Sequence, residues 1–218
     1  MELTLENISD LALEVGFDAC GVAPVRRLEA DAQFMDDWVA QGLHGEMDYL
    51  ARNCEKRYDP SVLVPGAQSV VVCLLRFDKS GRDYHRKVKS MLYMLEAELK
   101  EAFGEDVVSS THQHIFCDSA PVLERRWCVE AGLGWIGKNH QLVHPELGSL
   151  VHPGEIVLNV SVGGCRLVGI ESGCGDCRLC LDVCPTGALR NDVWDARECV
   201  AYATHHCLEC QVVCPYNK

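Results

Sequence analysis

The sequence predicts an α+β fold in two parts, a larger lobe of helices packed on a sheet and a small module at the C-terminal end. Residues 1–165 alternate between helical and extended patterns, whereas from Gly173 onward the sequence is rich in cysteine, glycine and proline. Strands separated by helices indicate a layered α/β or α+β lobe, and an abrupt change in composition indicates a domain boundary. We therefore expect one domain over residues 1–168 and a second over 169–218.

Helices are predicted where apolar residues recur at helical spacing, which occurs over residues 5–15, 28–40 and 84–103. In the longest of these, the apolar stripe consists of Val88, Leu92, Leu95 and Leu99. Ser119 is expected to cap a further helix, with Pro121 in its first turn.

Strands are predicted for the β-branched and apolar runs at residues 18–23, 69–77, 114–117 and 155–162. The run at 69–77, SVVVCLLRF, is the strongest because it is apolar on both faces. We therefore expect it to lie inside the sheet.

The charge and hydropathy of the chain exclude several function classes. The formal net charge of the 218 residues is −12, which argues against tight RNA or DNA binding because such binding depends on basic patches. No segment approaches the roughly 20 apolar residues of a membrane-spanning helix. The first six residues also lack the basic start and apolar stretch of a signal peptide. The sequence thus predicts a cytoplasmic protein with no membrane partner.

The fourteen cysteines are distributed unevenly. Six are scattered singly, and eight lie between Cys174 and Cys214. Because thiols stay reduced in the cytosol, clustered cysteines there indicate metal ligands and not disulfides.

The spacing of the eight clustered cysteines indicates two [4Fe–4S] clusters. Cys174-x2-Cys177-x2-Cys180-x3-Cys184-Pro185 is the bacterial ferredoxin pattern, in which the fourth cysteine binds the other cluster. The pattern recurs thirty positions later with Thr204 at the place of the first cysteine, and Cys199 is the nearby thiol that can replace it. We therefore expect one cluster on Cys174, Cys177, Cys180 and Cys214, and the other on Cys184, Cys199, Cys207 and Cys210.

Two alternatives remain open from the residues alone. Pairs of CxxC motifs also form zinc sites, although zinc requires neither a three-cysteine loop nor a Cys-Pro ending. The glycine-rich segment 131–139, AGLGWIGKN, suits a backbone that passes close to a large cofactor, but a glycine-rich turn is more often structural. It is not a P-loop, because the Gly-x4-Gly-Lys-Ser/Thr pattern is absent.

Several unusual stretches resemble the epoxyqueuosine reductase family. They cover residues 21–24, 44–50, 57–60, 65–70, 81–85, 118–125, 131–139, 148–149 and 154–156 of the larger lobe. In the cysteine array the resemblance includes 174–185, Cys199-x2-Tyr202-x-Thr204, and Cys210-Gln211-x2-Cys214-Pro215-x-Asn217. The resemblance extends, in order, over nearly the whole chain.

This resemblance implies a cobalamin-binding α/β sandwich, related to reductive dehalogenases and nitroreductases, that precedes a 2[4Fe–4S] ferredoxin module. It further implies that electrons pass through the clusters to cobalamin, and that an aspartate, here Asp118, donates a proton while oxygen is removed from an epoxide. The alternative is that Asp118 only caps the helix after it. The resemblance assigns the cofactor contacts to Arg57, Ser119, Gly134, Trp135, Lys138 and Asn139.

The chain departs from the family at three places. It ends at Lys218 without the basic helical-repeat region, it lacks an insertion before Cys207, and it has Val151-His152-Pro153 where the family usually has an aromatic-apolar pair. Together with the charge, the first two departures make tRNA a doubtful partner and favour a small-molecule or divergent substrate. The electrons are expected from an external donor of the ferredoxin or flavodoxin type.

The leading hypothesis is thus a cobalamin- and iron–sulfur-dependent reductase. The alternatives are an electron-transfer protein that reduces a corrinoid or flavin partner, and a corrinoid-binding protein without catalysis.

Overall fold

The computed structural model describes residues 2–77, 83–110, 112–165, 170–190, 193–204 and 207–217. The predicted domain boundary between residues 168 and 169 lies outside these residues. Below, residues 2–165 are called the larger lobe and residues 170–217 the cluster module.

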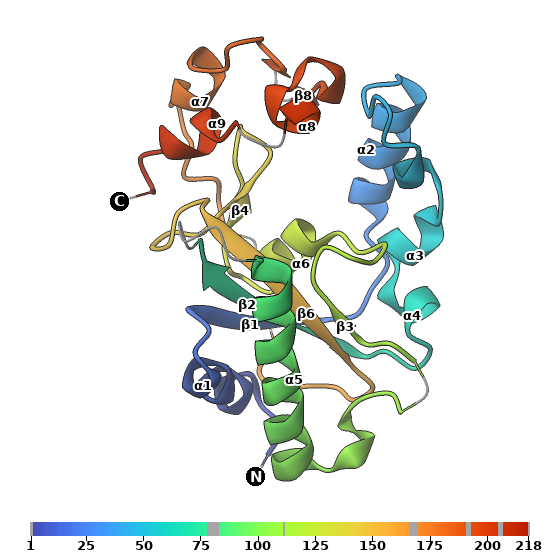
Figure 1. The fold of residues 1–218 in the computed structure, drawn as a ribbon. Helices are drawn as coiled ribbons and strands as arrows, with labels where there is room; N and C mark the ends of the chain where they lie inside the picture. The colour runs from blue at the N-terminus through green and yellow to red at the C-terminus, as the bar shows by residue number, and fades with distance from the viewer. Residues whose placement is uncertain are drawn as a thin grey trace.

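A four-stranded antiparallel sheet forms the centre of the larger lobe (Figure 1). Its order is β1-β2-β6-β3, with bounds Ala19–Pro24, Ser69–Arg76, Val151–Leu158 and Ile115–Phe116. The central strand β2 is buried from Ser69 to Leu75, as expected for a run that is apolar on both faces. Because every pairing is antiparallel, the lobe belongs to the α+β class.

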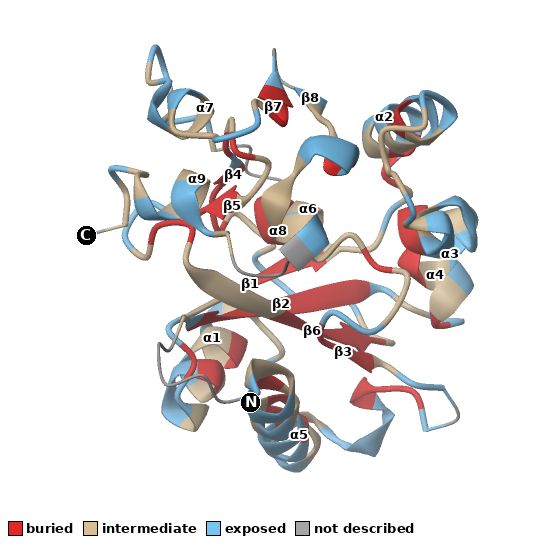
Figure 2. Ribbon diagram, turned by 45° about the horizontal axis from the view of Figure 1, so that its top comes forward, coloured by how far each residue is buried: buried red, intermediate tan, exposed pale blue. Residues whose placement is uncertain are grey.

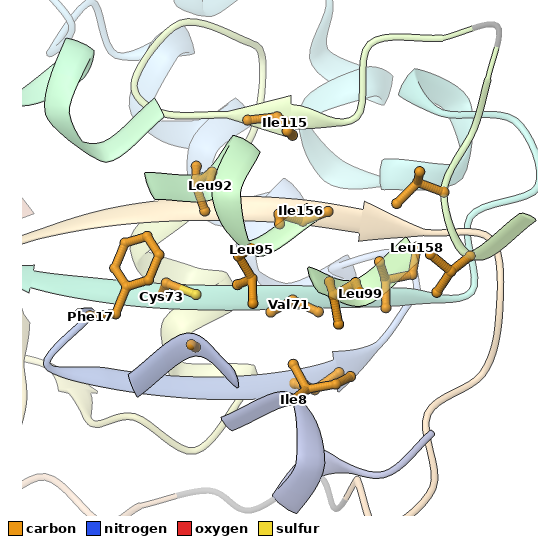
Figure 3. Close-up of a cluster of buried hydrophobic side chains, with 14 of the residues drawn as sticks. Ile8, Phe17, Val71, Cys73, Leu92, Leu95, Leu99, Ile115, Ile156 and Leu158 are labelled. Atoms are coloured by element: carbon orange, nitrogen blue, oxygen red, sulfur yellow. The ribbon is translucent and has the colours of Figure 1, made fainter. Parts of the chain in front are cut away.

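Helices α1 (Leu5–Val15) and α5 (Tyr84–Phe103) cover one face of the sheet. The stripe of α5 packs on Val71 and Ile156, and Figure 3 shows Leu92, Leu95 and Leu99 directed at these strands. Thr4 caps α1 by accepting a hydrogen bond from the Asn7 backbone N–H. This face is the main apolar core.

Helix α6 (Glu124–Glu130) packs on the opposite face, where Trp127 and Cys128 meet Val72 and Phe116. Figure 2 shows the sheet buried between these two layers. The short hairpin of β4 (Trp135–Ile136) and β5 (Leu142–Val143) follows α6. The remaining elements of the lobe are α2 (Glu29–Ala40), η1 (Asp48–Ala51), α3 (Cys54–Tyr58), α4 (Pro60–Leu63) and η2 (Glu105–Val107).

The cluster module consists of short elements joined by turns. They are α7 (Leu179–Asp182), β7 (Leu189–Arg190), β8 (Val193–Trp194), η3 (Ala196–Glu198), α8 (Val200–Thr204) and α9 (Glu209–Val212). Helices α7 and α9 contact each other. Trp194 stacks on Trp38 of α2 with ring centroids 5.6 Å apart, so the module also contacts helix α2 of the lobe.

The predicted helices over 5–15, 28–40 and 84–103 are confirmed to within one residue, and the strands over 18–23, 69–77 and 114–117 to within one residue at each end. The strand predicted over 155–162 is wrong at both ends, since β6 runs from Val151 to Leu158. Pro153 is tolerated in β6 because β3 pairs only with Glu155 and Ile156, which leaves the Pro153 side of the strand unpaired by β3.

The prediction for the helix after Asp118 is also wrong. Helix α6 begins at Glu124 and has Leu123 as its N-cap residue, without a side-chain cap, so Ser119 and Pro121 lie before it. Residues 120–122 form a tight turn instead, in which the Val122 N–H donates to the Ala120 carbonyl at 2.8 Å, and Leu123 accepts the first hydrogen bonds of α6. Asp118, before this turn, has a left-handed φ of +50°. Residues 118–123 therefore form a loop.

Among the described residues, every helix is too short or too polar to cross a lipid bilayer.

Candidate functional site: two thiol groups and an aspartate loop

The first predicted group of thiols lines one cavity. Cys174, Cys177, Cys180 and Cys214 surround a space of about 280 Å³, together with Lys138, Asn139 and Tyr216 of its wall. Burial raises the pKa of the Cys180 thiol, and the charges of Cys174, Cys177 and Cys214 raise it further, which shows that the four thiols are neighbours. The structure thus brings Cys214 to the loop that carries the first three cysteines.

The second predicted group is also brought together. Burial raises the pKa of the Cys210 thiol to about 11, and Cys207, Cys199, Cys180 and Cys184 add to this effect in that order. Cys199, the proposed substitute for the missing first cysteine of the repeat, therefore lies near Cys210. Because Cys180 also acts on Cys210, the two groups adjoin each other.

The thiols are spread around a space and do not converge on one point. Among the described residues, no three or more His, Cys, Asp or Glu side chains lie close enough to hold a single metal ion. A cubane binds each thiolate through a different iron atom, so a cavity lined by four thiols is the arrangement that this cofactor fits. The donor set and the cavity together fit a [4Fe–4S] cluster.

The glycine-rich segment after α6 holds the cluster module in place. Lys138 Nζ donates hydrogen bonds to the carbonyls of Gly175 (2.6 Å) and Cys177 (3.0 Å), and Asn139 Nδ2 donates to the carbonyl of Cys210 (3.1 Å). Trp135 Nε1 donates to the sulfur of Cys174 at 3.4 Å. Each of the three side chains thus contacts the backbone or sulfur of a predicted cluster cysteine or its loop.

These contacts also favour the thiolate of Cys174. Burial raises the pKa of Cys174. Hydrogen bonds from the Trp135 indole, the backbone of Lys138 and the Ser172 hydroxyl lower it by more, so the net effect is a lowered pKa. Since iron binds the thiolate form, this environment prepares Cys174 as a ligand.

Asn217 forms a second junction, which the sequence analysis did not assign. Its Oδ1 accepts hydrogen bonds from the backbone N–H of Ser149 (2.6 Å) and Leu150 (3.3 Å), and its Nδ2 donates to the Ser149 hydroxyl at 3.0 Å. Gln211 Nε2 donates to the Ser149 carbonyl at 2.6 Å. The only signal in the sequence was that these residues stand in two of the family-like stretches, 148–149 and 210–217.

Asp118 lies in the exposed loop between β3 and α6. The hydroxyl of Tyr84, the first residue of α5, donates a hydrogen bond of 2.8 Å to Asp118 Oδ2. The Tyr84 ring stacks between His85 (centroids 3.9 Å apart) and His152 (3.8 Å). Burial, followed by the contact with Asp118, raises the pKa of Tyr84 well above its ordinary value, so the phenol stays protonated as a donor.

Two buried glutamates lie behind this loop. Glu155 of β6 is fully buried, and neither of its carboxyl oxygens has a hydrogen-bond partner among the described residues. Burial raises the pKa of Glu124, at the start of α6, to about 7. Burial, followed by the charges of Glu124 and Asp118, raises the pKa of Glu155 as well. Both carboxyl groups therefore keep a proton to a higher pH than an exposed glutamate does.

The six residues predicted to contact cobalamin do not form one set. Arg57 is buried at the end of α3, where it donates to the carbonyls of Leu50 (3.1 Å), Arg52 (3.0 Å) and Tyr49 (3.3 Å). At Gly134, φ is +155° and an added Cβ would lie 2.2 Å from the Val143 carbonyl oxygen, so this glycine is required by the hairpin. Ser119 is exposed next to Asp118.

The side chains of Arg57, Trp135, Lys138 and Asn139 thus each have a protein partner, and their contact with a corrinoid stays a prediction.

Comparison with known proteins agrees with this architecture. A family model described as "4Fe-4S double cluster binding domain" matches residues 173–207. Epoxyqueuosine reductases from Leadbetterella byssophila and Cyclobacterium marinum are each 34% identical to the chain, over 98% and 100% of it and 80% of their own length. The chain belongs to the epoxyqueuosine reductase family. The alignments span 248 and 255 positions against 218 residues, so these relatives carry segments that this chain lacks.

Solved structures of the family have the same fold. An epoxyqueuosine reductase crystallised with a tRNA-Tyr stem loop superposes with a TM-score of 0.82 at 27% identity. The Bacillus subtilis epoxyqueuosine reductase, described with its aspartate-bearing catalytic loop swung out of the active site, gives 0.79 at 28%. The chain covers 64% and 65% of these structures.

A reductive dehalogenase described as B12-dependent shares the fold more distantly, with a TM-score of 0.58 and 18% identity.

Proposed function

We propose that this chain is an iron–sulfur reductase that removes the oxygen of an epoxide on a queuosine-type nucleoside, with Asp118 as the proton donor. One observation carries the proposal. A chain of the epoxyqueuosine reductase family has both two anchored thiol groups and an exposed aspartate that is held by Tyr84. The activity is a proposal because the chain spans 80% of its curated relatives and less than two thirds of the solved structures.

The reaction balances with the groups that the chain provides. Removal of the epoxide oxygen breaks two C–O bonds and forms a C=C bond, and it consumes two electrons and two protons while releasing water. We propose that the electrons arrive from an external low-potential donor, pass through two [4Fe–4S] clusters on the thiol groups, and are delivered on the Asp118 side of the lobe. Asp118, which is exposed and accepts a hydrogen bond from Tyr84 at Oδ2, is placed to give one of the two protons.

Cobalamin belongs to the proposal on the strength of the family resemblance and the shared dehalogenase fold. Because four of the side chains predicted to bind it are engaged elsewhere, no step is assigned to it. Anaerobic incubation with cobalamin, followed by gel filtration, tests this part separately: a corrinoid spectrum that co-elutes with the protein supports it, and a protein fraction without that spectrum removes it.

The substrate class is inferred from the family. Experiment decides whether the epoxide is reduced on a free nucleoside or on a nucleoside within tRNA. A 27% identical relative was solved with a tRNA stem loop, which makes tRNA a stronger candidate here than the charge of −12 alone suggested. The segments that relatives carry and this chain lacks argue for a smaller substrate. Epoxyqueuosine should therefore be offered both as a free nucleoside and within a tRNA stem loop.

The decisive experiment compares the Asp118→Asn variant with wild type after anaerobic reconstitution of iron and sulfide. We expect turnover to fall about 100-fold or more, since that is the usual contribution of a general acid, while iron content is unchanged. Asp10→Asn, at an exposed position of α1, is the matched control and should keep full activity. If wild type reduces an acceptor protein but no epoxide, and Asp118→Asn does so equally well, the chain is an electron-transfer protein instead.

A further inference from the structure

The backbone at Asp118 is held in an unfavourable conformation. Asp118 is a non-glycine residue with φ of +50°, a region that L side chains enter at a cost and leave unless their surroundings hold them. Its side chain is exposed, so packing alone does not restrain it. Specific contacts must therefore keep the loop in place.

The first contact is from α5. Tyr84 donates to Asp118 Oδ2 at 2.8 Å, and its ring lies nearly parallel to His152 of β6, with an interplanar angle of 9°. His85 stacks on it at 28°. The phenol therefore approaches Asp118 from a position fixed by two elements, and it sets the direction of the carboxyl group.

A second group near the loop lies in α6. Glu124, at the start of that helix, is close enough to Asp118 for the charge and backbone of Asp118 to act on the pKa of its carboxyl group. Glu124 Oε1 is buried and has no hydrogen-bond partner among the described residues. The ionisable groups that act on Glu124, or on which it acts, are Asp118, Arg125, Tyr84, Cys117, Cys128 and, from β6, Glu155.

We propose that Tyr84 is a positioning residue that holds the Asp118 loop in place through the carboxyl group of Asp118. The inference rests on the proposed function only for its effect on turnover. In the Bacillus subtilis relative the corresponding kind of loop has been described as swung out of the active site, so an aspartate loop in this family has two positions. The Tyr84 hydrogen bond favours the position seen in this structure, and its loss leaves the strained backbone free to relax.

The test measures the loop directly. Deuterium uptake by peptides covering residues 117–123 is compared between wild type and Tyr84→Phe, both as iron-loaded protein. We expect uptake to be about tenfold faster in Tyr84→Phe, because the hydrogen bond that closes the loop has been removed. Tyr93→Phe on α5 and Glu98→Gln, both exposed on the same helix, are matched controls that should exchange like wild type.

Kinetics provide the second readout. If Tyr84 positions Asp118, Tyr84→Phe lowers kcat about tenfold or more with little change in KM, because misplacement of a reacting group acts on the chemical step. A purely structural role would instead change exchange over the whole of residues 84–103.

The outcomes are separable. Unchanged uptake at 117–123 in Tyr84→Phe overturns the inference. Absence of epoxide reduction by wild type overturns the proposed function and leaves the exchange result to decide about the loop. Tyr84→Phe keeps the ring that stacks on His85 and His152, so the variant removes only the hydrogen bond.

Discussion

The larger lobe and the cluster module are built on different physical principles. The lobe surrounds its sheet with two apolar layers, in which Leu92, Leu95, Leu99 and Trp127 are fully buried. Among the described residues of the module, the only buried apolar side chains are Ala188, Leu189 and Ala196. Helices α7 and α9 span four residues each, which is too short for helices that are stable alone.

This difference shows that the module lacks an apolar core of its own among the described residues. Its thiols surround a cavity of about 280 Å³ in the place where a domain of this size would have packed side chains. The cofactor is therefore expected to serve as its core, while the lobe folds without it. Three experiments test this difference between the lobe and the module.

The largest effect is expected from removing a cluster ligand. Cys180→Ser should lose about half of the bound iron and sulfide, because one of two four-iron clusters loses a ligand. Hydrogen exchange should then become fast over residues 170–217 and stay slow in α5. Cys54→Ser, a cysteine outside both thiol groups, is the control and should bind iron like wild type. If Cys180→Ser loses iron but residues 170–217 stay protected as in wild type, the view that the cofactor is the module's core is contradicted.

The next effect concerns the core of the lobe. Leu95→Ala should lower the free energy of unfolding of the lobe by about 2–5 kcal/mol, because it leaves a cavity in a fully buried site. Denaturant unfolding followed by circular dichroism measures this, and Met94→Ala, at an exposed position next to it, should change little. Iron content below the transition should stay as in wild type; a loss of iron would mean that the two regions unfold together.

A smaller change in the free energy of unfolding is expected when the pH is varied. Burial raises the pKa of Glu124 from 4.5 to about 7, so between these values the folded chain keeps a proton that the unfolded chain releases. The free energy of unfolding should therefore fall as pH rises through this window, by up to about 3 kcal/mol. Burial acts on Glu155 in the same direction. Unfolding curves between pH 4.5 and 8 test this, and Glu124→Gln should flatten the slope; equal slopes would show that the buried carboxyl does not titrate there.

The two regions also differ in which of their features could be predicted from the sequence. The helices of the lobe were predictable because residues such as Val88, Leu92, Leu95 and Leu99 repeat with a helical period. The thiol groups were predictable because the spacing of cysteines limits which sulfurs can meet, and the structure brings Cys199 and Cys214 to the groups expected from that spacing. The assignment of clusters to these groups stays a prediction.

Contacts between distant segments were not predictable. Lys138 and Asn139 donate to the backbone of the cluster module, and the sequence does not indicate these partners because they depend on tertiary placement; the contact of both residues with a corrinoid stays a prediction. Ser119 was expected at a helix cap, but a tight turn at residues 120–122 stands where that helix was expected to begin. Asn217 carries no chemical pattern that indicates a junction, and Arg57 carries none that indicates its three carbonyl partners.

The indole of Trp135 belongs to the lobe, yet it touches the sulfur of Cys174. An iron–sulfur cluster absorbs light where indole emits, so assembly on that sulfur should quench this residue's fluorescence. Among the four tryptophans of the chain, Trp135 thus gives an optical signal for loading of the first cluster without any label. The replacement Trp135→Phe would remove the signal and serve as its blank.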